Sequence, residues 1–194
     1  VNPCQGIKGY TEEGRDVYVE DNIYDAIYQV ASQPLKDALD LAYLTGQRPA
    51  DVIAMSVADI QDKILLVQQG KTNAKLRISV TGELKSLLER ILKSKQAHKV
   101  RTSQLICTET GRPISQNALR LRFDKARDKA IKQNPAIAKD VKHFQFRDLR
   151  AKAASDKAES ETMRDAQLQL GHSSMAMTEQ YVRQRRGQKV SPTR

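Results

Sequence analysis

Apolar residues recur at intervals of three and four along most of the chain, which is the spacing of amphipathic helices. We expect helices that begin near residues 21, 34, 49, 81 and 115, followed by three shorter ones at about 147–158, 161–169 and 174–182. Residues that favour helix ends set these boundaries. They are Asp21, Thr81 and Ser115 as N-caps, Gly46 as a C-terminal stop, Pro49 in a first turn and Pro135 as a terminator.

Three short segments have the aliphatic and β-branched composition of strands: Ile64–Val67, Leu76–Val80 and Leu105–Cys107. The turn-forming stretch Gly70–Lys75 separates the first two, so it predicts a β-hairpin with Lys71 at its mouth. Together, the helical and strand patterns predict a mainly α fold with a small antiparallel β-sheet, an α+β domain.

Composition narrows the class of protein. The 194 residues are 39% hydrophobic, which is enough for one domain with a full core. The formal net charge of +10 favours a polyanionic partner, because basic surface attracts phosphate groups. No apolar run approaches the roughly 20 residues of a membrane helix. Cys4 and Cys107 lie far apart without Cys-x-x-Cys spacing, which favours two reduced thiols in a cytoplasmic protein over a disulfide framework or a zinc site.

Side chains suited to phosphodiester chemistry occur in five short motifs. In chain order these are Thr45-Gly46-Gln47-Arg48-Pro49, Gly70-Lys71-Thr72, Phe146-Arg147-Asp148-Leu149-Arg150, Leu170-Gly171-His172 and Glu179-Gln180-Tyr181-Val182-Arg183. Each motif alone is an ordinary turn, helix end or link between helices. Their joint order on compatible elements favours attack on a phosphodiester without a metal ion.

Each residue type has a physical reason to take part. A guanidinium presents a planar fork of donors to phosphate oxygens and keeps its proton, so two arginines can stabilise the charge that develops during attack. A lysine in a hairpin turn can protonate the leaving oxygen. A histidine near the phosphate can donate a hydrogen bond or move a proton. The tyrosine hydroxyl would be the nucleophile, although its ordinary pKa near 10 makes it a poor one without help.

The motifs resemble the catalytic domain of tyrosine recombinases, the phage-integrase family, from about Gly14 to Tyr181. The resemblance implies that Arg48 and Arg150 clamp the scissile phosphate and that Lys71 is the general acid. It also implies that His172 assists at the phosphate. Tyr181 would then form a covalent 3′-phosphotyrosyl bond and free a 5′ hydroxyl, with no metal, nucleotide or other cofactor.

The same resemblance implies a domain organisation and a set of partners. Residues 1–20 would be a lead-in or linker from a missing N-terminal DNA-binding domain, 21–182 the catalytic domain, and 183–194 a basic C-terminal tail. The implied partner is double-stranded DNA, bound by a homotetramer that assembles through the tail. Accessory DNA-bending proteins are a further partner class for such a recombinase, and the implied location is the cytoplasm, at the nucleoid of a bacterial host.

One position departs from the family pattern. The family most often has histidine where this chain has Arg147, and arginine cannot accept the Tyr181 proton as a neutral base. Arg147 could still bind the phosphate or its surroundings. His143, four residues earlier, is an alternative that could take the place of the usual histidine in space.

Four basic residues are the candidates for further DNA contacts: Arg120, Arg122 and Lys125 on the helix after Ser115, and Lys75 at the hairpin. A solvated helix face is the alternative explanation for the charges on that helix.

Three other functions remain possible for the chain. Arg147 is compatible with a catalytically weakened, DNA-binding member of the family. A type IB topoisomerase shares the chemistry but acts as a monomer, whereas the basic tail favours an assembling recombinase. A metal-dependent nuclease would need clustered carboxylates, and the sequence has no convincing cluster.

Overall fold

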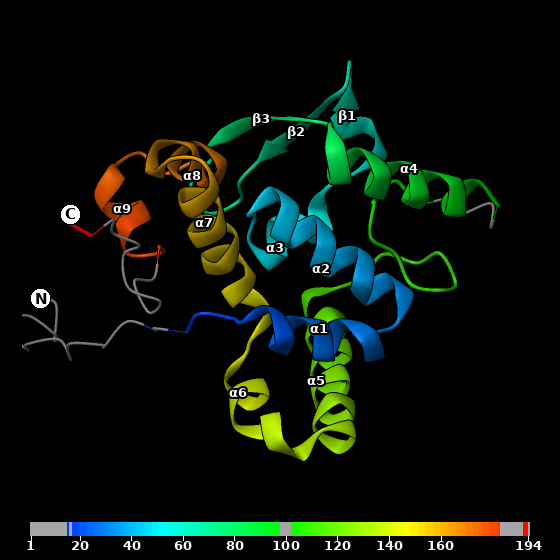
Figure 1. Ribbon diagram of the computed structural model, residues 1–194. Helices are drawn as coiled ribbons and strands as arrows, with labels where there is room; N and C mark the ends of the chain where they lie inside the picture. Colours follow the sequence, from blue (N-terminus) through cyan, green and yellow to red (C-terminus); the bar gives the residue numbers. More distant parts are fainter. Residues whose placement is uncertain (1–14, 16, 98–101, 183–191, 194) are drawn as a thin grey trace, which may run out of the picture.

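The computed structural model describes residue 15 and residues 17–97, 102–182 and 192–193. Of the predicted lead-in, the structure describes only residues 15 and 17–20, and of the predicted tail only residues 192 and 193. The rest of both segments lies outside the described residues. Figure 1 shows the arrangement of the helices and strands. In chain order they are α1 (Asp21–Val30), α2 (Gln33–Thr45), α3 (Pro49–Ala54), η1 (Val57–Asp59), β1 (Ile60–Gln61), β2 (Ile64–Gln68), β3 (Lys75–Ser79), α4 (Gly82–Ala97), α5 (Gln116–Gln133), η2 (Pro135–Ile137), α6 (Ala138–His143), η3 (Phe146–Asp148), α7 (Leu149–Ser160), α8 (Met163–Leu170) and α9 (Met175–Glu179).

Helix α2 runs through the middle of the molecule and packs on α3, α4, α5 and α7 (Figure 1). Its sequence suits this position, because Leu35, Leu39 and Leu41 are buried together with the small residues Ala38 and Ala42. Small side chains allow neighbouring helices to approach closely, while the leucines fill the space between them. Because α2 is held on several sides, its C-terminal end is a fixed point for the residues that follow.

The three strands form one antiparallel sheet in the order β1-β2-β3. In β2, Leu65 and Val67 are buried and alternate with more exposed neighbours, as expected for a strand with one face on the core. The register pairs Ile64 with Ser79 and Gln68 with Lys75. The predicted hairpin is therefore confirmed, and residues 69–74 form the loop between β2 and β3.

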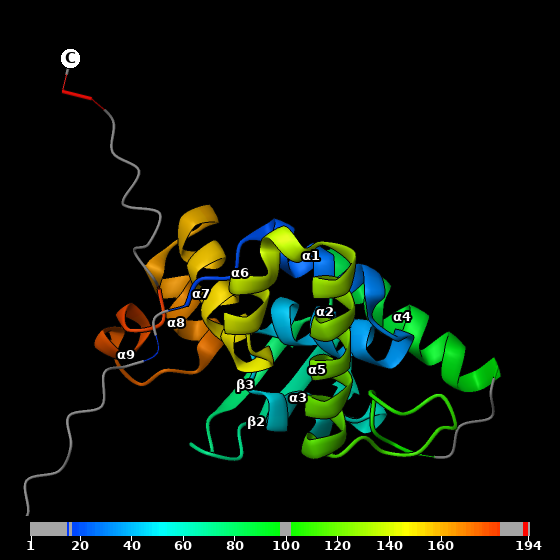
Figure 2. The same cartoon turned by 90° about the horizontal axis from the view of Figure 1, so that it is seen from below.

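Helices α1, α5 and α6 pack together in the lower part of Figure 1, which comes forward in Figure 2. Phe123 of α5 meets Phe144 and Phe146 edge to face, with ring centroids 5.0 and 5.8 Å apart. Such edge-to-face pairs stabilise a core beyond the area that they bury. They anchor the segment that leads into α7, which carries Arg150 in its first turn.

The predicted boundaries hold at some helix ends and fail at others. Gly46 follows α2 in the left-handed conformation (φ +67°), Pro49 opens α3, and the Ser115 hydroxyl accepts from Ala118 N–H at 3.2 Å. Asp21, by contrast, is the first residue of α1 and not its N-cap. Glu20 precedes the helix without a side-chain capping bond.

The strand predicted at Leu105–Cys107 is wrong. In this region the structure has two isolated bridges, Ser56 to Gln104 and Cys107 to Pro113, although Leu105 and Ile106 are buried. From Pro135 onwards, η2 and α6 form where no element was predicted.

Within the described ranges, no helix is both long and apolar enough to cross a membrane.

The fold class nevertheless agrees with the prediction of a mainly α domain with a small antiparallel sheet.

Candidate active site

The turn between α2 and α3 places Arg48. Gly46 adopts φ +67° to end α2, and a Cβ atom there would lie 3.2 Å from Leu170 Cδ2, so glycine suits both the conformation and the space. Arg48 has an extended backbone and precedes Pro49 in the first turn of α3. Its Nη1 donates to Gln69 Oε1 at 2.9 Å and lies 3.8 Å from Asp51 Oδ2. The Arg48 side chain is about four-fifths buried.

Arg150 is almost completely buried, with an exposed fraction of 2%. Its Nη1 donates to Gly46 O and its Nη2 to Leu170 O, both at 2.7 Å, while Nη2 lies 3.1 Å from His172 Nε2. The buried Nε has no hydrogen-bond partner among the described residues. Burial, followed by the charge of Arg48, lowers the pKa of Arg150 to about 10, and the interaction with Tyr181 opposes that change. The side chain is still a cation at neutral pH.

His172 follows Gly171, whose left-handed conformation (φ +63°) ends α8. The His172 N–H donates to Gln167 O at 3.1 Å, and Gln167 Nε2 donates to His172 O at 3.0 Å. Burial, with the charges of Arg150 and Arg48, lowers the pKa of His172 to about 4. The imidazole is therefore neutral at pH 7.

The contacts of His172 identify its tautomer. A guanidinium only donates, so Nε2, which lies 3.1 Å from Arg150 Nη2, must be the acceptor. The ring proton is then on Nδ1, which lies 3.1 Å from the Thr178 hydroxyl oxygen. Thr178 is fully buried on α9. Thr178 thus connects the histidine to the short helix that precedes Tyr181.

Tyr181 comes two residues after the end of α9 and is half-buried. Its N–H donates to Thr178 O at 2.8 Å. The centroid of its ring lies 5.0 Å from that of His172, and the guanidinium carbon of Arg150 lies over the ring at 5.5 Å. The Tyr181 ring is therefore in contact with an arginine and a neutral histidine of the same chain, a placement that the sequence does not predict.

Lys71 is exposed in the loop between β2 and β3. The residues on both sides of it are anchored. The Gly70 N–H donates to Asp51 Oδ1 at 2.9 Å, and the Thr72 hydroxyl donates to Gln69 Oε1 at 2.7 Å. The loop that carries Lys71 is thus attached to the same residues as Arg48.

Arg147 and His143, two further candidates from the sequence, are both exposed. Arg147 is exposed in the η3 turn, and His143 is exposed at the end of α6. Among the described residues, no hydrogen bond, ion pair or ring contact joins either side chain to Arg150, His172 or Tyr181. The neighbouring Asp148 is buried, accepts from the Gln145 N–H and pairs with Arg15, so this turn is firmly held.

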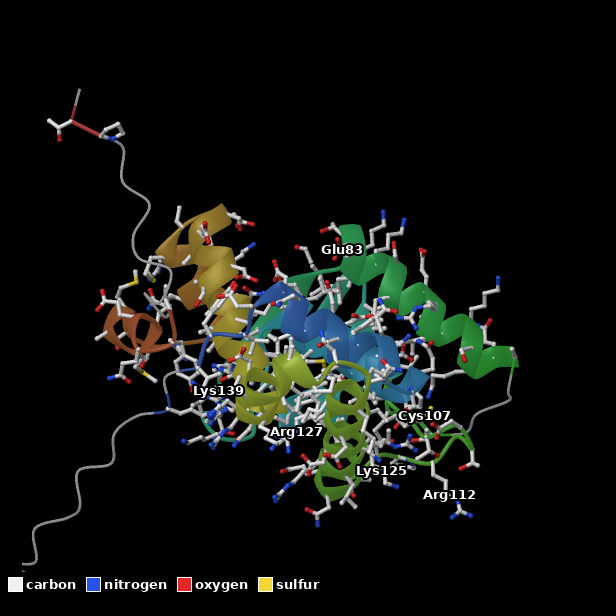
Figure 3. All side chains as sticks on the ribbon, turned by 60° about the horizontal axis from the view of Figure 1, so that its bottom comes forward. Glu83, Cys107, Arg112, Lys125, Arg127 and Lys139 are labelled. Atoms are coloured by element: carbon white, nitrogen blue, oxygen red, sulfur yellow. The ribbon has the colours of Figure 1, made fainter. Side chains whose placement is uncertain are left out.

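The four candidate DNA-binding residues differ in their surroundings. Lys75 on β3 and Arg120 and Lys125 on α5 are exposed, and Arg120 Nε lies 3.7 Å from Asp124 Oδ2. Arg122 instead makes two bonds of 2.7 Å to the carboxylate of Glu109, so much of its charge is already paired. Figure 3 shows Lys125 on α5 and Arg112 in the preceding turn, where Arg112 points away from the fold.

Two buried residues of the site were not predicted from the sequence. They are Gln69, which contacts Arg48, and Thr178, which contacts His172. Neither follows from local sequence, because a glutamine after a strand and a threonine in a helix are both common. Among the residues that the structure describes, no group of three or more histidine, cysteine, aspartate or glutamate side chains could hold a metal ion.

Comparisons with known proteins point to a family. The profile of the phage integrase family matches residues 18–187. The chain is 31% identical over 188 residues to the integrase of Escherichia phage HK022, covering 93% of this chain and 50% of that protein. It is 32% identical over 168 residues to the integrase of Escherichia phage lambda, covering 81% and 44%. The chain therefore spans about half the length of the curated relatives that it matches.

Solved structures agree with the sequence comparisons. A lambda integrase tetramer bound to a Holliday junction superimposes with a TM-score of 0.74 and 27% identity, covering 95% of this chain and 52% of that one. The lambda integrase catalytic core superimposes with a TM-score of 0.64 and 26% identity, covering 81% of this chain and 92% of that one. The mainly α fold with its small sheet is thus the fold of that catalytic core.

Proposed function

This chain belongs to the phage integrase family, and we propose that it is a tyrosine-type DNA strand transferase, a site-specific recombinase. It would cut and rejoin DNA through a covalent 3′-phosphotyrosyl intermediate, without a metal ion or ATP. The observation that carries the proposal is the contact of Tyr181 with the Arg150 guanidinium and the neutral His172 ring.

Arg48 and Arg150 are the proposed phosphate ligands. Arg48 donates to Gln69, and both Gln69 and Arg150 donate to Leu170 O, so the two guanidinium groups belong to one hydrogen-bonded cluster. The charge of Arg48 lowers the pKa of Arg150, which indicates repulsion between them. A bound phosphate between them would relieve that repulsion and would gain from donors that are already oriented. The Nε of Arg150, buried without a partner among the described residues, is a further donor for an anion.

Tyr181 is the proposed nucleophile and Lys71 the general acid. The Tyr181 oxygen forms a bond to phosphorus while the bond from phosphorus to the 5′ oxygen breaks, and Lys71 gives that oxygen a proton. The phenol proton must also leave. The Arg147 side chain cannot take it. His172 is neutral at pH 7, but its one Nε2 lone pair accepts from Arg150 Nη2 in the free chain, so Nε2 would take the phenol proton only once the bound phosphate has taken over that Arg150 donor. The same steps in reverse reseal the strand.

DNA is the proposed substrate and a homotetramer the proposed working form. The net charge of +10 suits a DNA partner. The lambda integrase structures that this chain resembles are described as bound to a core site and, as a tetramer, to a Holliday junction. Binding of two DNA sites by four copies would let paired strand exchanges recombine them. Lys75, Arg120 and Lys125 remain the candidates for backbone contacts.

Relaxation of supercoiled plasmid in the presence of EDTA tests the proposal, because it needs no knowledge of the target site. We expect the chain to relax the plasmid and to be trapped on DNA by SDS, and Tyr181→Phe to do neither. Nicking that requires a metal ion and survives in Tyr181→Phe would contradict the proposal and favour a nuclease.

Two further comparisons address the alternatives that share the fold. If Arg147→His raised relaxation by orders of magnitude, the natural chain would be a catalytically weakened member of the family. Binding of a synthetic Holliday junction as a tetramer separates a recombinase from a type IB topoisomerase, which relaxes DNA as a monomer.

A further inference from the structure

Gln69 is a fully buried amide where three parts of the candidate site meet. It directly follows β2, at the start of the loop that carries Lys71. Its side chain also contacts Arg48 from the α2–α3 turn and the end of α8 just before His172. These elements meet on the side of the molecule that carries α7, α8 and α9 (Figure 1). No role for this residue follows from the five motifs.

All four hydrogen-bonding positions of the Gln69 amide are used. Its Oε1 accepts from Arg48 Nη1 at 2.9 Å and from the Thr72 hydroxyl at 2.7 Å. Its Nε2 donates to Gln47 Oε1 at 2.7 Å and to Leu170 O at 2.8 Å. The orientation of the amide is unambiguous, because Arg48 can only donate and a backbone carbonyl can only accept. No other side chain of this size offers two acceptor and two donor positions in that arrangement.

The backbone of Gln69 closes the loop around Lys71. Its N–H donates to Ala74 O, and its carbonyl accepts from the Asn73 N–H, both at 2.9 Å. The Thr72 hydroxyl also donates to the Gln69 side chain, and the Gly70 N–H donates to Asp51. These bonds hold the residues on both sides of Lys71. The position of the lysine backbone therefore depends on the same amide that orients Arg48.

We propose that Gln69 is a positioning residue that places the Lys71 loop and Arg48 relative to each other, so that the acid and the phosphate ligand meet the same phosphodiester. This inference rests on the proposed function. Gln69 itself would touch neither the substrate nor the reacting atoms. A general acid is effective only within hydrogen-bonding reach of the leaving oxygen, so a small displacement of the loop should reduce proton transfer strongly.

The test compares two leaving groups. The substrate is a duplex oligonucleotide that copies a cleavage position mapped on the relaxed plasmid, with either the natural 5′ oxygen or a bridging 5′ sulfur. Sulfur leaves without a proton, so the ratio of the oxygen rate to the sulfur rate reports on the general acid alone. Rates are measured as formation of the SDS-trapped covalent complex.

We expect Gln69→Ala to lower this ratio by about tenfold or more, as Lys71→Ala should. The double variant should lower the ratio no further than Lys71→Ala alone. Gln69→Glu keeps acceptors for Arg48 and Thr72, and its ratio should lie between those of Gln69→Ala and the unaltered chain.

Two matched variants separate positioning from general damage. Gln169→Ala removes another amide at the same junction, one that donates to Leu44 O and, within the described part of the chain, has no side-chain hydrogen bond to Arg48 or the loop. Thr178→Val removes a buried hydroxyl that contacts His172. Both should slow the two substrates equally and leave the ratio unchanged.

An unchanged ratio in Gln69→Ala, with a lowered ratio in Lys71→Ala, would overturn the inference and leave the proposed function standing. An unchanged ratio in Lys71→Ala itself, or a covalent complex with Tyr181→Phe, would instead count against the proposed function. Urea unfolding of each variant verifies that the chains compared are folded.

Discussion

At the scale of single residues, the candidate site depends on which atoms carry protons. His172 can accept at Nε2 only while its proton stays on Nδ1, opposite the Thr178 hydroxyl. The partner of the second ring nitrogen commonly decides the tautomer of a histidine. The buried Thr178 on α9 therefore influences whether His172 Nε2 can accept a hydrogen bond, although Thr178 itself contacts Nδ1.

Replacing Thr178 with valine tests this dependence, because valine has the same shape without the hydroxyl. The Nδ1–H would be buried without an acceptor, and the other tautomer would direct a proton at the Arg150 donor. We expect Thr178→Val to slow covalent-complex formation by about tenfold, the equivalent of one lost buried hydrogen bond. Thr178→Ser should retain most of the rate.

Thr45→Val is the matched control, since it removes another buried threonine hydroxyl, one that donates to Leu41 O within α2. Equal loss of rate in Thr45→Val and Thr178→Val would mean that the Thr178 effect is one of general packing.

The low pKa of His172 also predicts a dependence of stability on pH. The pKa is about 4 in the folded chain and about 6.5 when unfolded, so between these values only the unfolded chain binds the proton. Stability should therefore fall as the pH decreases from about 6.5 towards 4, by up to about 1.4 kcal/mol per pH unit from this group. Above pH 6.5 the group contributes no pH dependence.

Urea unfolding of the unaltered chain and of His172→Asn at several pH values measures this contribution, because carboxylates that titrate nearby are common to both. The slope should be smaller in His172→Asn. His143→Asn serves as the control for loss of an exposed imidazole. Identical slopes in all three chains would contradict the assignment.

The sequence predicts some of these residues and not others, for a physical reason. Arg48, Arg150 and His172 occupy helix ends that local signals mark, such as Gly46, Pro49 and Gly171, so their motifs could be placed before the fold was known. Gln69 and Thr178 gain their roles from partners distant in sequence or from a particular ring orientation. Nothing in the residues next to them specifies those partners.

At the scale of secondary-structure elements, the end of α8 is the most constrained backbone of the site. Gly171 has φ +63°, and a Cβ atom there would lie 3.1 Å from Gln69 Nε2 and 3.2 Å from Leu76 Cδ2. The glycine thus permits both the left-handed conformation and the close approach of the hairpin to α8.

We expect Gly171→Ala to destabilise the chain by about 2–3 kcal/mol, of which about 1–2 is backbone strain and the rest crowding. Gly82→Ala isolates the strain, because Gly82 also has a positive φ (+52°), but a Cβ atom there would have no heavy atom of the described residues within 4 Å. The difference between the two urea midpoints measures the crowding. Equal losses of stability in both variants would show that the hairpin does not crowd a Cβ atom at position 171.

Elements were predictable where their pattern is long and local. The apolar spacing of α2, α4 and α5 gives helices of 13, 16 and 18 residues, and each was expected. The Leu105–Cys107 strand was wrong because an apolar run becomes a strand only if a partner is available, and this one forms isolated bridges. The segment η2–α6 is too short for a periodic signal, and it is held by Val141 and Phe144 in the core.

At the scale of the whole molecule, the fold brings the distant segments that carry Arg48, Lys71, Arg150, His172 and Tyr181 to one place. The α2–α3 turn, the β2–β3 loop and the start of α7 are each anchored on the core, and α8 joins them through Leu170 O. The net charge of +10 would draw this surface to DNA. The central claim is that Tyr181 becomes covalently joined to that DNA.

Mass spectrometry of the SDS-trapped complex, after nuclease and trypsin digestion, tests this claim most directly. Cleavage after Arg164 and Arg183 would release a peptide of residues 165–183, whose single tyrosine is Tyr181. We expect a nucleotide adduct on that tyrosine, joined through a 3′ phosphate, and free 5′ hydroxyl ends on the DNA. An adduct on any other residue, or cut DNA without an adduct, would contradict the account.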